Sequence, residues 1–102
     1  MVIEVATLFV KNEAEADFVR DFTKGADILR RQPGCRNLRW GKRVEPELAF
    51  ILEVEWGEIQ DHFNFRETDD FATFGGYFRP HLSKAPEVVH FEPGGLTQPN
   101  RI

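Results

Sequence analysis

Residues 48 to 56, LAFILEVEW, show the clearest alternation of apolar and polar side chains in the chain. One face of this segment is apolar throughout, and the other holds Ala49, Ile51, Glu53 and Glu55. This period of two predicts a strand whose two faces meet different environments. Three further strands are predicted in segments rich in β-branched and mixed-polarity residues, over 2–10, 36–44 and 87–92.

A first helix is predicted between the first two strands. Its apolar residues recur at helical spacing, at Phe18, Phe22, Ala26 and Leu29. Asn12 is a candidate cap for its start, and the Pro33-Gly34 pair ends it.

Two shorter helices are predicted between the third and fourth strands. One covers residues 58–66, and the next begins after Thr68 as its cap and carries the stripe Phe71, Phe74 and Phe78. The pair Gly75-Gly76 weakens this helix and Pro80 bends or ends it.

The predicted order β-α-β-β-α-β is typical of a ferredoxin-like α+β sandwich with four antiparallel strands and helices on one face. We expect the face of Phe50 and Trp56 to lie under the helices. The opposite, half-apolar face is expected to be covered by a second copy of the chain, which predicts a homodimer. One domain over residues 1–93 and a turn-rich tail over 94–102 complete the expected organisation.

Composition narrows the functional classes. The chain has 102 residues and a formal net charge of −4 with no basic run, which argues against nucleic-acid binding. It has one cysteine, Cys35, so no internal disulfide is possible. We expect neither a signal peptide nor a membrane span, because the N-terminus has no basic region and no apolar run reaches about 18 residues. A soluble, cytoplasmic protein is therefore expected.

Several motifs together resemble the antibiotic-biosynthesis monooxygenase (ABM) domains of the dimeric α/β-barrel superfamily. They are QPGC before the second strand, the strand ending VEW, the pair His62-Phe63, the Phe71–Phe74 helix and the closing PEVVHFEP. The resemblance implies a homodimer whose sheets form a barrel, with a cavity between sheet and helices in each subunit. It also implies that some members use no metal or organic cofactor and convert phenols to quinones with O₂, whereas other members degrade haem.

The resemblance marks Trp56 as a candidate site residue, and the chemistry of nearby polar and aromatic residues adds the other candidates. Trp56 would orient an aromatic substrate, His62 would accept a phenolic proton, and Arg79 or His81 would stabilise the developing oxyanion or superoxide. Phe50, Phe74, Tyr77 and Phe78 would complete the substrate-binding surface. Each candidate also has a structural interpretation: Trp56 closing the core, His62 solvated or bonded to Asp61, and Arg79 and His81 at a helix end.

Other chemistries find less support in the sequence. His62, His81 and His90 are not at local metal-ligand spacings, so no metal is predicted. The resemblance implies that no other cofactor is needed. A haem-degrading site is disfavoured because the first strand offers Ala6 and Thr7 where the family places Asn. His90 is expected to be a bonded interior residue, and Cys35 to be buried filler. An RNA-recognition domain is excluded by the acidic open face of the third strand. The alternative to a monooxygenase is a non-catalytic ligand-binding or structural homodimer of the same fold.

Overall fold

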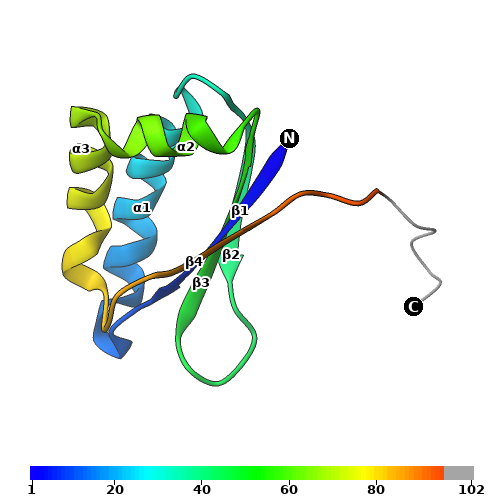
Figure 1. Cartoon of the computed structure of the whole chain (residues 1–102). Helices are drawn as coiled ribbons and strands as arrows, with labels where there is room; N and C mark the ends of the chain where they lie inside the picture. Colours follow the sequence, from blue (N-terminus) through cyan, green and yellow to red (C-terminus); the bar gives the residue numbers. More distant parts are fainter. Residues whose placement is uncertain (96–102) are drawn as a thin grey trace.

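The computed structural model describes residues 1–95, which form a four-stranded sheet with helices on one face (Figure 1). Of the predicted 94–102 tail, residues 96–102 lie outside the described residues. The elements in chain order are β1 (Val2–Phe9), α1 (Glu15–Arg30), β2 (Cys35–Lys42), β3 (Ala49–Trp56), α2 (Ile59–Arg66), α3 (Asp69–Phe78) and β4 (Glu87–Phe91), with single 3₁₀ turns at Asn12–Ala14 and Arg79–His81.

The strands lie in the order β2-β3-β1-β4, and every neighbouring pair is antiparallel. This is the ferredoxin-like arrangement that the sequence predicts, with β1 and β3 at the centre. The register pairs Glu4 of β1 with Val54 on one side and with His90 of β4 on the other. Residues from the two ends of the described chain therefore meet on the helix-facing side of the sheet.

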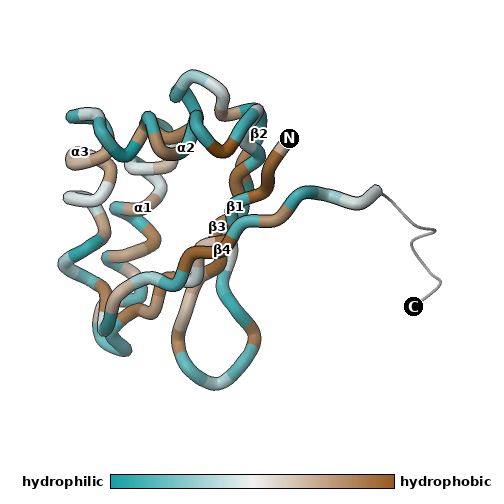
Figure 2. Tube along the Cα trace, in the orientation of Figure 1, coloured by the Kyte–Doolittle hydropathy of each residue, from teal (hydrophilic) through white to brown (hydrophobic). Residues whose placement is uncertain are grey.

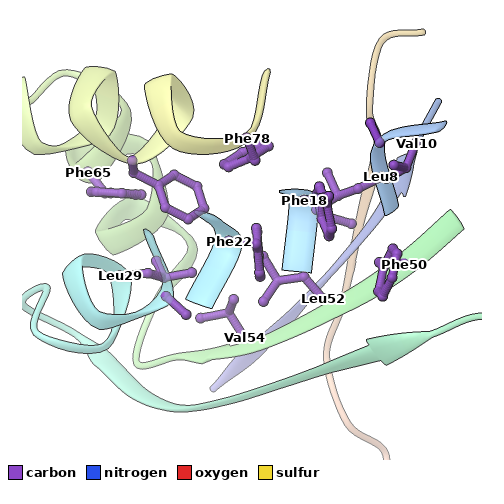
Figure 3. Packing of buried hydrophobic residues seen from close by; sticks show 14 of the residues in the cluster. Leu8, Val10, Phe18, Phe22, Leu29, Phe50, Leu52, Val54, Phe65 and Phe78 are labelled. Carbon is purple, nitrogen blue, oxygen red and sulfur yellow. The ribbon is translucent and has the colours of Figure 1, made fainter. Parts of the chain in front are cut away.

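The core lies between the sheet and the helices. Phe18, Phe22 and Leu29 of α1 point toward Phe50, Leu52 and Val54 of β3, and Phe65 and Phe78 close the layer (Figure 3). The prediction that Phe50 and Trp56 lie under the helices is confirmed. Burial of these large apolar side chains is the main force that holds the helical layer on the sheet.

The start of α1 differs from the prediction. Asn12 opens a short 3₁₀ turn rather than capping the helix, and no side-chain cap bond forms at the N-cap of that turn or at Ala14, the N-cap of α1. The turn fits here because Lys11, just before it, is tied by its backbone N–H to the carbonyl of His81. A local propensity is overridden by a tertiary contact.

The start of α2 holds a capping box that the sequence analysis missed. The Glu58 side chain accepts from the backbone of Asp61, whose own side chain accepts from the Glu58 N–H at 2.9 Å. The predicted cap at Thr68 is confirmed, since its hydroxyl accepts from the Phe71 N–H. These two caps fix where α2 and α3 begin, and so fix the direction of the side chains that α2 sends toward the sheet.

Among residues 1–95, no helix covers the second face of the sheet (Figure 1). Val89 and Phe91 of β4 are 61% and 50% exposed there, beside Ile3 of β1. A groove of about 680 Å³ crosses this face. By contrast, the loop between β2 and β3 is mostly hydrophilic (Figure 2). No helix within residues 1–95 is long and apolar enough to cross a membrane.

Candidate functional site

A cavity of about 260 Å³ lies between the sheet and the helices. Most of its wall is apolar. One carboxyl group, one imidazole and two guanidinium groups supply the polar part. The apolar lining residues are Ala6, Leu8, Leu52, Phe71, Phe74, Phe78, Pro86 and Val88, and the polar ones are Glu4, His62, Arg66 and Arg79. An apolar pocket with a few convergent polar groups is the common form of a small-molecule site.

Trp56 holds the polar end of this cavity in place. Its indole is fully buried, and its ring is stacked on His62 with centroids 5.4 Å apart and an interplanar angle of 11°. Its Nε1–H donates to Glu4 Oε1 at 2.9 Å. Trp56 and His62 therefore lie on the same side of the sheet, next to one cavity.

Glu4, His62 and His90 form a row of contacting polar side chains, which we call the Glu4–His62–His90 chain. The Nδ1 atom of His62 is 2.8 Å from Nε2 of His90, a hydrogen-bond distance. The other ring nitrogen of His62, Nε2, faces Glu4 Oε1 at 3.4 Å. Glu4 and His62 are buried and His90 is half-buried. The three residues come from β1, α2 and β4.

Burial governs the protonation of this chain. It raises the pKa of Glu4, against the opposing effects of the Trp56 hydrogen bond and of the Arg66 charge. Burial, with His90 and Arg66 nearby, lowers the pKa of His62 to about 4, and burial and Arg66 lower the pKa of His90. Both imidazoles are thus held neutral at physiological pH, and the carboxyl group becomes a stronger base than an ordinary Glu.

Cys35 lies at the edge of this group. Burial raises the pKa of its thiol, and the charge of Glu4 raises it further. A thiol that resists ionisation is a poor nucleophile, which agrees with the expectation that Cys35 is packing material.

The Glu4–His62–His90 chain contains ligand types that metal ions prefer, because two imidazoles and a carboxylate lie within 4.8 Å of one another. A tetrahedral ion bound to two imidazole nitrogens at 2.0–2.1 Å separates them by roughly 3.3 Å. The His62 and His90 nitrogens are 2.8 Å apart, and Glu4 faces the other nitrogen of His62. This arrangement fits one hydrogen bond between the imidazoles and a polar contact with Glu4 better than it fits a chelate.

Four of the sequence-predicted site residues line the cavity: His62, Phe74, Phe78 and Arg79. Within residues 1–95, the lining does not include Trp56, Phe50, Tyr77 or His81. Trp56 and Phe50 lie buried behind it, in the core. Trp56 reaches the cavity only through its contacts with Glu4 and His62.

His81 belongs to a different cluster. Its Nε2 is 2.8 Å from Asp21 Oδ2 of α1, and Arg20 bonds the same carboxylate. These two partners hold the pKa of Asp21 well below its usual range. Arg79, in contrast, lies over the Phe71 ring at 5.5 Å and reaches the cavity.

Glu4 was not predicted as a site residue, whereas His90 was predicted to be a bonded interior residue, and it is half-buried and within hydrogen-bond distance of His62. A signal for Glu4 was present in the alternation of the first strand. Glu4 shares a face with Ala6 and Leu8, and this face lies under the helices. A lone carboxylate on a buried apolar face requires a partner, and that requirement marks a candidate site.

Comparison with known proteins identifies the family of this chain. The model of the family "Antibiotic biosynthesis monooxygenase" matches residues 1–76. The uncharacterised Bacillus subtilis (strain 168) protein YczJ is 28% identical over 93 residues, which cover 90% of this chain and 98% of YczJ.

Two solved structures illustrate the similarity of the fold. A proposed antibiotic biosynthesis monooxygenase from Bordetella bronchiseptica has a TM-score of 0.85 at 24% identity, covering 90% of this chain and 95% of its own. A variant of SnoaB, a cofactor-independent oxygenase from Streptomyces nogalater, has a TM-score of 0.79 at 18% identity. The match covers 93% of this chain and 94% of the SnoaB chain. Since the family model spans about three quarters of its length, the chain belongs to the antibiotic biosynthesis monooxygenase family.

Proposed function

We propose that the cavity binds a small phenol or hydroquinone and that the protein oxygenates it to a quinone with O₂, without a metal or organic cofactor. The observation that carries this proposal is the polar end of the cavity, where Glu4 and His62 meet an otherwise aromatic and aliphatic wall. The family and the likeness to SnoaB, described as a cofactor-independent oxygenase, support the reaction class.

The volume of the cavity limits the substrate. Ligand pockets in proteins commonly range from about 300 to 1,000 Å³, and this cavity is slightly smaller at about 260 Å³. An aromatic of one or two rings fits this size. The rings of Phe71, Phe74 and Phe78 supply apolar contact to a flat ring, and the Glu4–His62 end accepts its hydroxyl group.

The chemistry needs one proton acceptor. Loss of the phenolic proton makes an electron-rich phenolate, which gives an electron to O₂ far more readily than the neutral phenol. Recombination forms a carbon–oxygen bond, and cleavage of the O–O bond with loss of the ring hydrogen leaves a quinone and water. The ring carbon is oxidised, O₂ is fully reduced, and the accepted proton returns to the departing oxygen.

Arg66 and Arg79 supply positive charge at the cavity. A guanidinium group favours an anionic oxygen, so both residues would stabilise the phenolate or the reduced oxygen species. Arg79 retains here the role that the sequence indicates. His81 is not part of this proposal, because its ring bonds Asp21.

Oxygen uptake with 1-naphthol, with a metal chelator present, tests the proposal. We expect uptake by the wild type, and a fall of roughly 10²-fold or more in His62→Ala, because this variant disrupts the polar end of the cavity on which acid–base chemistry depends. His81→Ala is the matched control, since its ring bonds a carboxylate outside the cavity, and it should keep the wild-type rate. Equal rates in wild type and His62→Ala would contradict the role of this end of the cavity.

A non-catalytic binding protein is the competing function. It is favoured by the same apolar wall, which holds an aromatic ligand whether or not a reaction follows. Absence of uptake across a panel of hydroxylated benzenes and naphthalenes, together with anaerobic binding of the same compounds, would support it.

We also propose that the protein is a homodimer that joins through the helix-free face of the sheet. Val89 and Phe91 are exposed on this face beside a groove of about 680 Å³. Exposed apolar side chains grouped on one sheet face favour coverage by a partner, and a second copy is the simplest partner.

A further inference from the structure

The ring of His62 has little capacity left for a substrate. Its Nδ1 contacts His90 at 2.8 Å and its Nε2 faces Glu4 Oε1 at 3.4 Å. A neutral imidazole has one donor and one acceptor nitrogen, and both are directed at protein groups here. Direct transfer of a ligand proton to His62 would require one of these contacts to break.

Glu4 has the capacity that His62 lacks. Its Oε1 accepts from Trp56 at 2.9 Å and faces His62. Its other oxygen, Oε2, has no hydrogen-bond partner among the described residues. Glu4 lines the cavity, so an unshared carboxylate oxygen is available to a bound hydroxyl group.

The carboxylate also decides the tautomer of His62. A carboxylate only accepts hydrogen bonds, so the nitrogen that faces it, Nε2, carries the hydrogen. The Nδ1 atom is then an acceptor, and the hydrogen in the 2.8 Å contact comes from Nε2 of His90. With this tautomer, His90 donates to His62, the Nε2–H of His62 faces Glu4, and Trp56 donates to Glu4.

We propose that Glu4 is the catalytic base that takes the phenolic proton, and that His62 and His90 are positioning residues that orient its carboxylate. This inference rests on the proposed function. The O–H bond of the phenol breaks as an O–H bond to Glu4 forms. The resulting carboxylic acid later returns the proton to the oxygen that leaves as water, so Glu4 is regenerated in each cycle. Two other titratable groups lie near the Glu4 carboxylate: the Arg66 guanidinium, whose positive charge stabilises its ionised form, and the Cys35 thiol.

Glu4→Gln is the sharpest test of the base, because Gln keeps the shape of Glu4 and a carbonyl that can accept from Trp56. We expect oxygen uptake with 1-naphthol to fall by roughly 10²-fold or more, while anaerobic affinity for 1-naphthol changes by less than a factor of about 10. Asp21→Asn is the matched control, a carboxylate bonded to a histidine outside the cavity, and it should leave uptake unchanged. Uptake within threefold of the wild type in Glu4→Gln would overturn the assignment.

The positioning role has its own readout, which needs no turnover. Nitrogen NMR of labelled imidazoles should find His62 as the Nε2–H tautomer in the wild type. Loss of the donor in His90→Ala should reduce the population of that tautomer and slow turnover without raising KM, and His90→Gln, whose amide can donate, should restore both. A wild-type His62 with its hydrogen on Nδ1 would refute the orientation of the chain.

The two proposals can fail separately. An inactive wild type with every probe would remove the oxygenase function. The contact of Glu4 with a ligand hydroxyl would then be judged by anaerobic affinity for 1-naphthol relative to naphthalene. A charged acceptor predicts a preference of about 10-fold or more for the naphthol in the wild type, reduced in Glu4→Gln. Equal affinities for the two probes in the wild type would overturn the Glu4 assignment.

Discussion

His62 is a buried imidazole with a carboxylate on one side and a second imidazole on the other. Its low pKa, about 4, makes it a source of acid sensitivity. The unfolded chain binds a proton at this residue near pH 6.5, whereas the folded protein resists it until about pH 4. Folding stability from this residue is therefore present above about pH 6.5 and is lost as the pH falls toward 4.

Glu4 acts in the opposite direction, because its raised pKa means that the folded state holds a proton at a pH where the unfolded state has released it. A comparison of wild type with His62→Gln isolates the histidine. Urea titrations should show that the wild type loses unfolding free energy relative to His62→Gln as the pH falls from about 6.5 to 4. A difference that stays constant over this range would contradict a lowered His62 pKa.

A second residue-level prediction concerns the indole of Trp56. Trp56→Phe keeps an aromatic ring for stacking on His62 and removes the donor to Glu4. We expect a loss of about 1–3 kcal/mol, since a buried acceptor is left without its partner. A double-mutant cycle with Glu4→Leu should show coupling of similar size. Purely additive effects in the cycle would mean that the hydrogen bond contributes nothing to stability.

Part of the site was predictable from the sequence at this scale. The alternation over residues 48–56 places Trp56 on the helix-covered face, and the chain reversal after it brings His62 back over that face. The pairing of Glu4 with His90 was not predicted, because it depends on strand register: β1 and β4 align residues 4 and 90 directly. No local pattern states which residues of two distant strands will face each other.

At the level of elements, the strands and helices follow the hydrophobic pattern closely. The strands predicted at 2–10 and 36–44 are found at Val2–Phe9 and Cys35–Lys42, and the stripe of α3 packs as expected. The differences lie at ends, as at Asn12, where contacts from distant residues decide the backbone. Termini are the least determined part of an element, because few hydrogen bonds fix them.

Replacing two different glycines by alanine is expected to change stability in opposite directions. Gly76, inside α3, would meet nothing within 4 Å if it carried a Cβ. Gly76→Ala should therefore stabilise the protein by about 0.5–1 kcal/mol through helix propensity. Gly34 has a φ of +84°, and a Cβ at this position would clash with the Asp61 side chain of the α2 capping box.

We expect Gly34→Ala to cost about 1–3 kcal/mol, from backbone strain and a displaced cap. Thermal unfolding of the two variants beside the wild type is sufficient to compare them. A stabilised Gly34→Ala would show that the turn between α1 and β2 relaxes at little cost, and a destabilised Gly76→Ala would show that α3 needs the flexibility of its glycine pair.

At the level of the whole molecule, assembly is the property most open to a direct test. Sedimentation at micromolar concentration should report about twice 11.8 kDa. Val89→Glu places a charge on the helix-free face and should give a folded monomer. Val44→Glu is the matched control, because Val44 is 92% exposed in the β2–β3 loop, and it should remain dimeric. A monomeric wild type would remove the proposed dimer.

The Glu4–His62–His90 chain joins residues that are 58 and 28 positions apart, from the first strand, the second helix and the last strand. A site assembled from such separated segments cannot form early in folding, because closing long loops costs entropy before any contact compensates for it. Its chemistry should therefore return only in the last, cooperative step of refolding, together with the docking of β4. The proposed oxygenase activity would then measure completion of the fold, because partly folded chains would not hold the Glu4 carboxylate at the cavity.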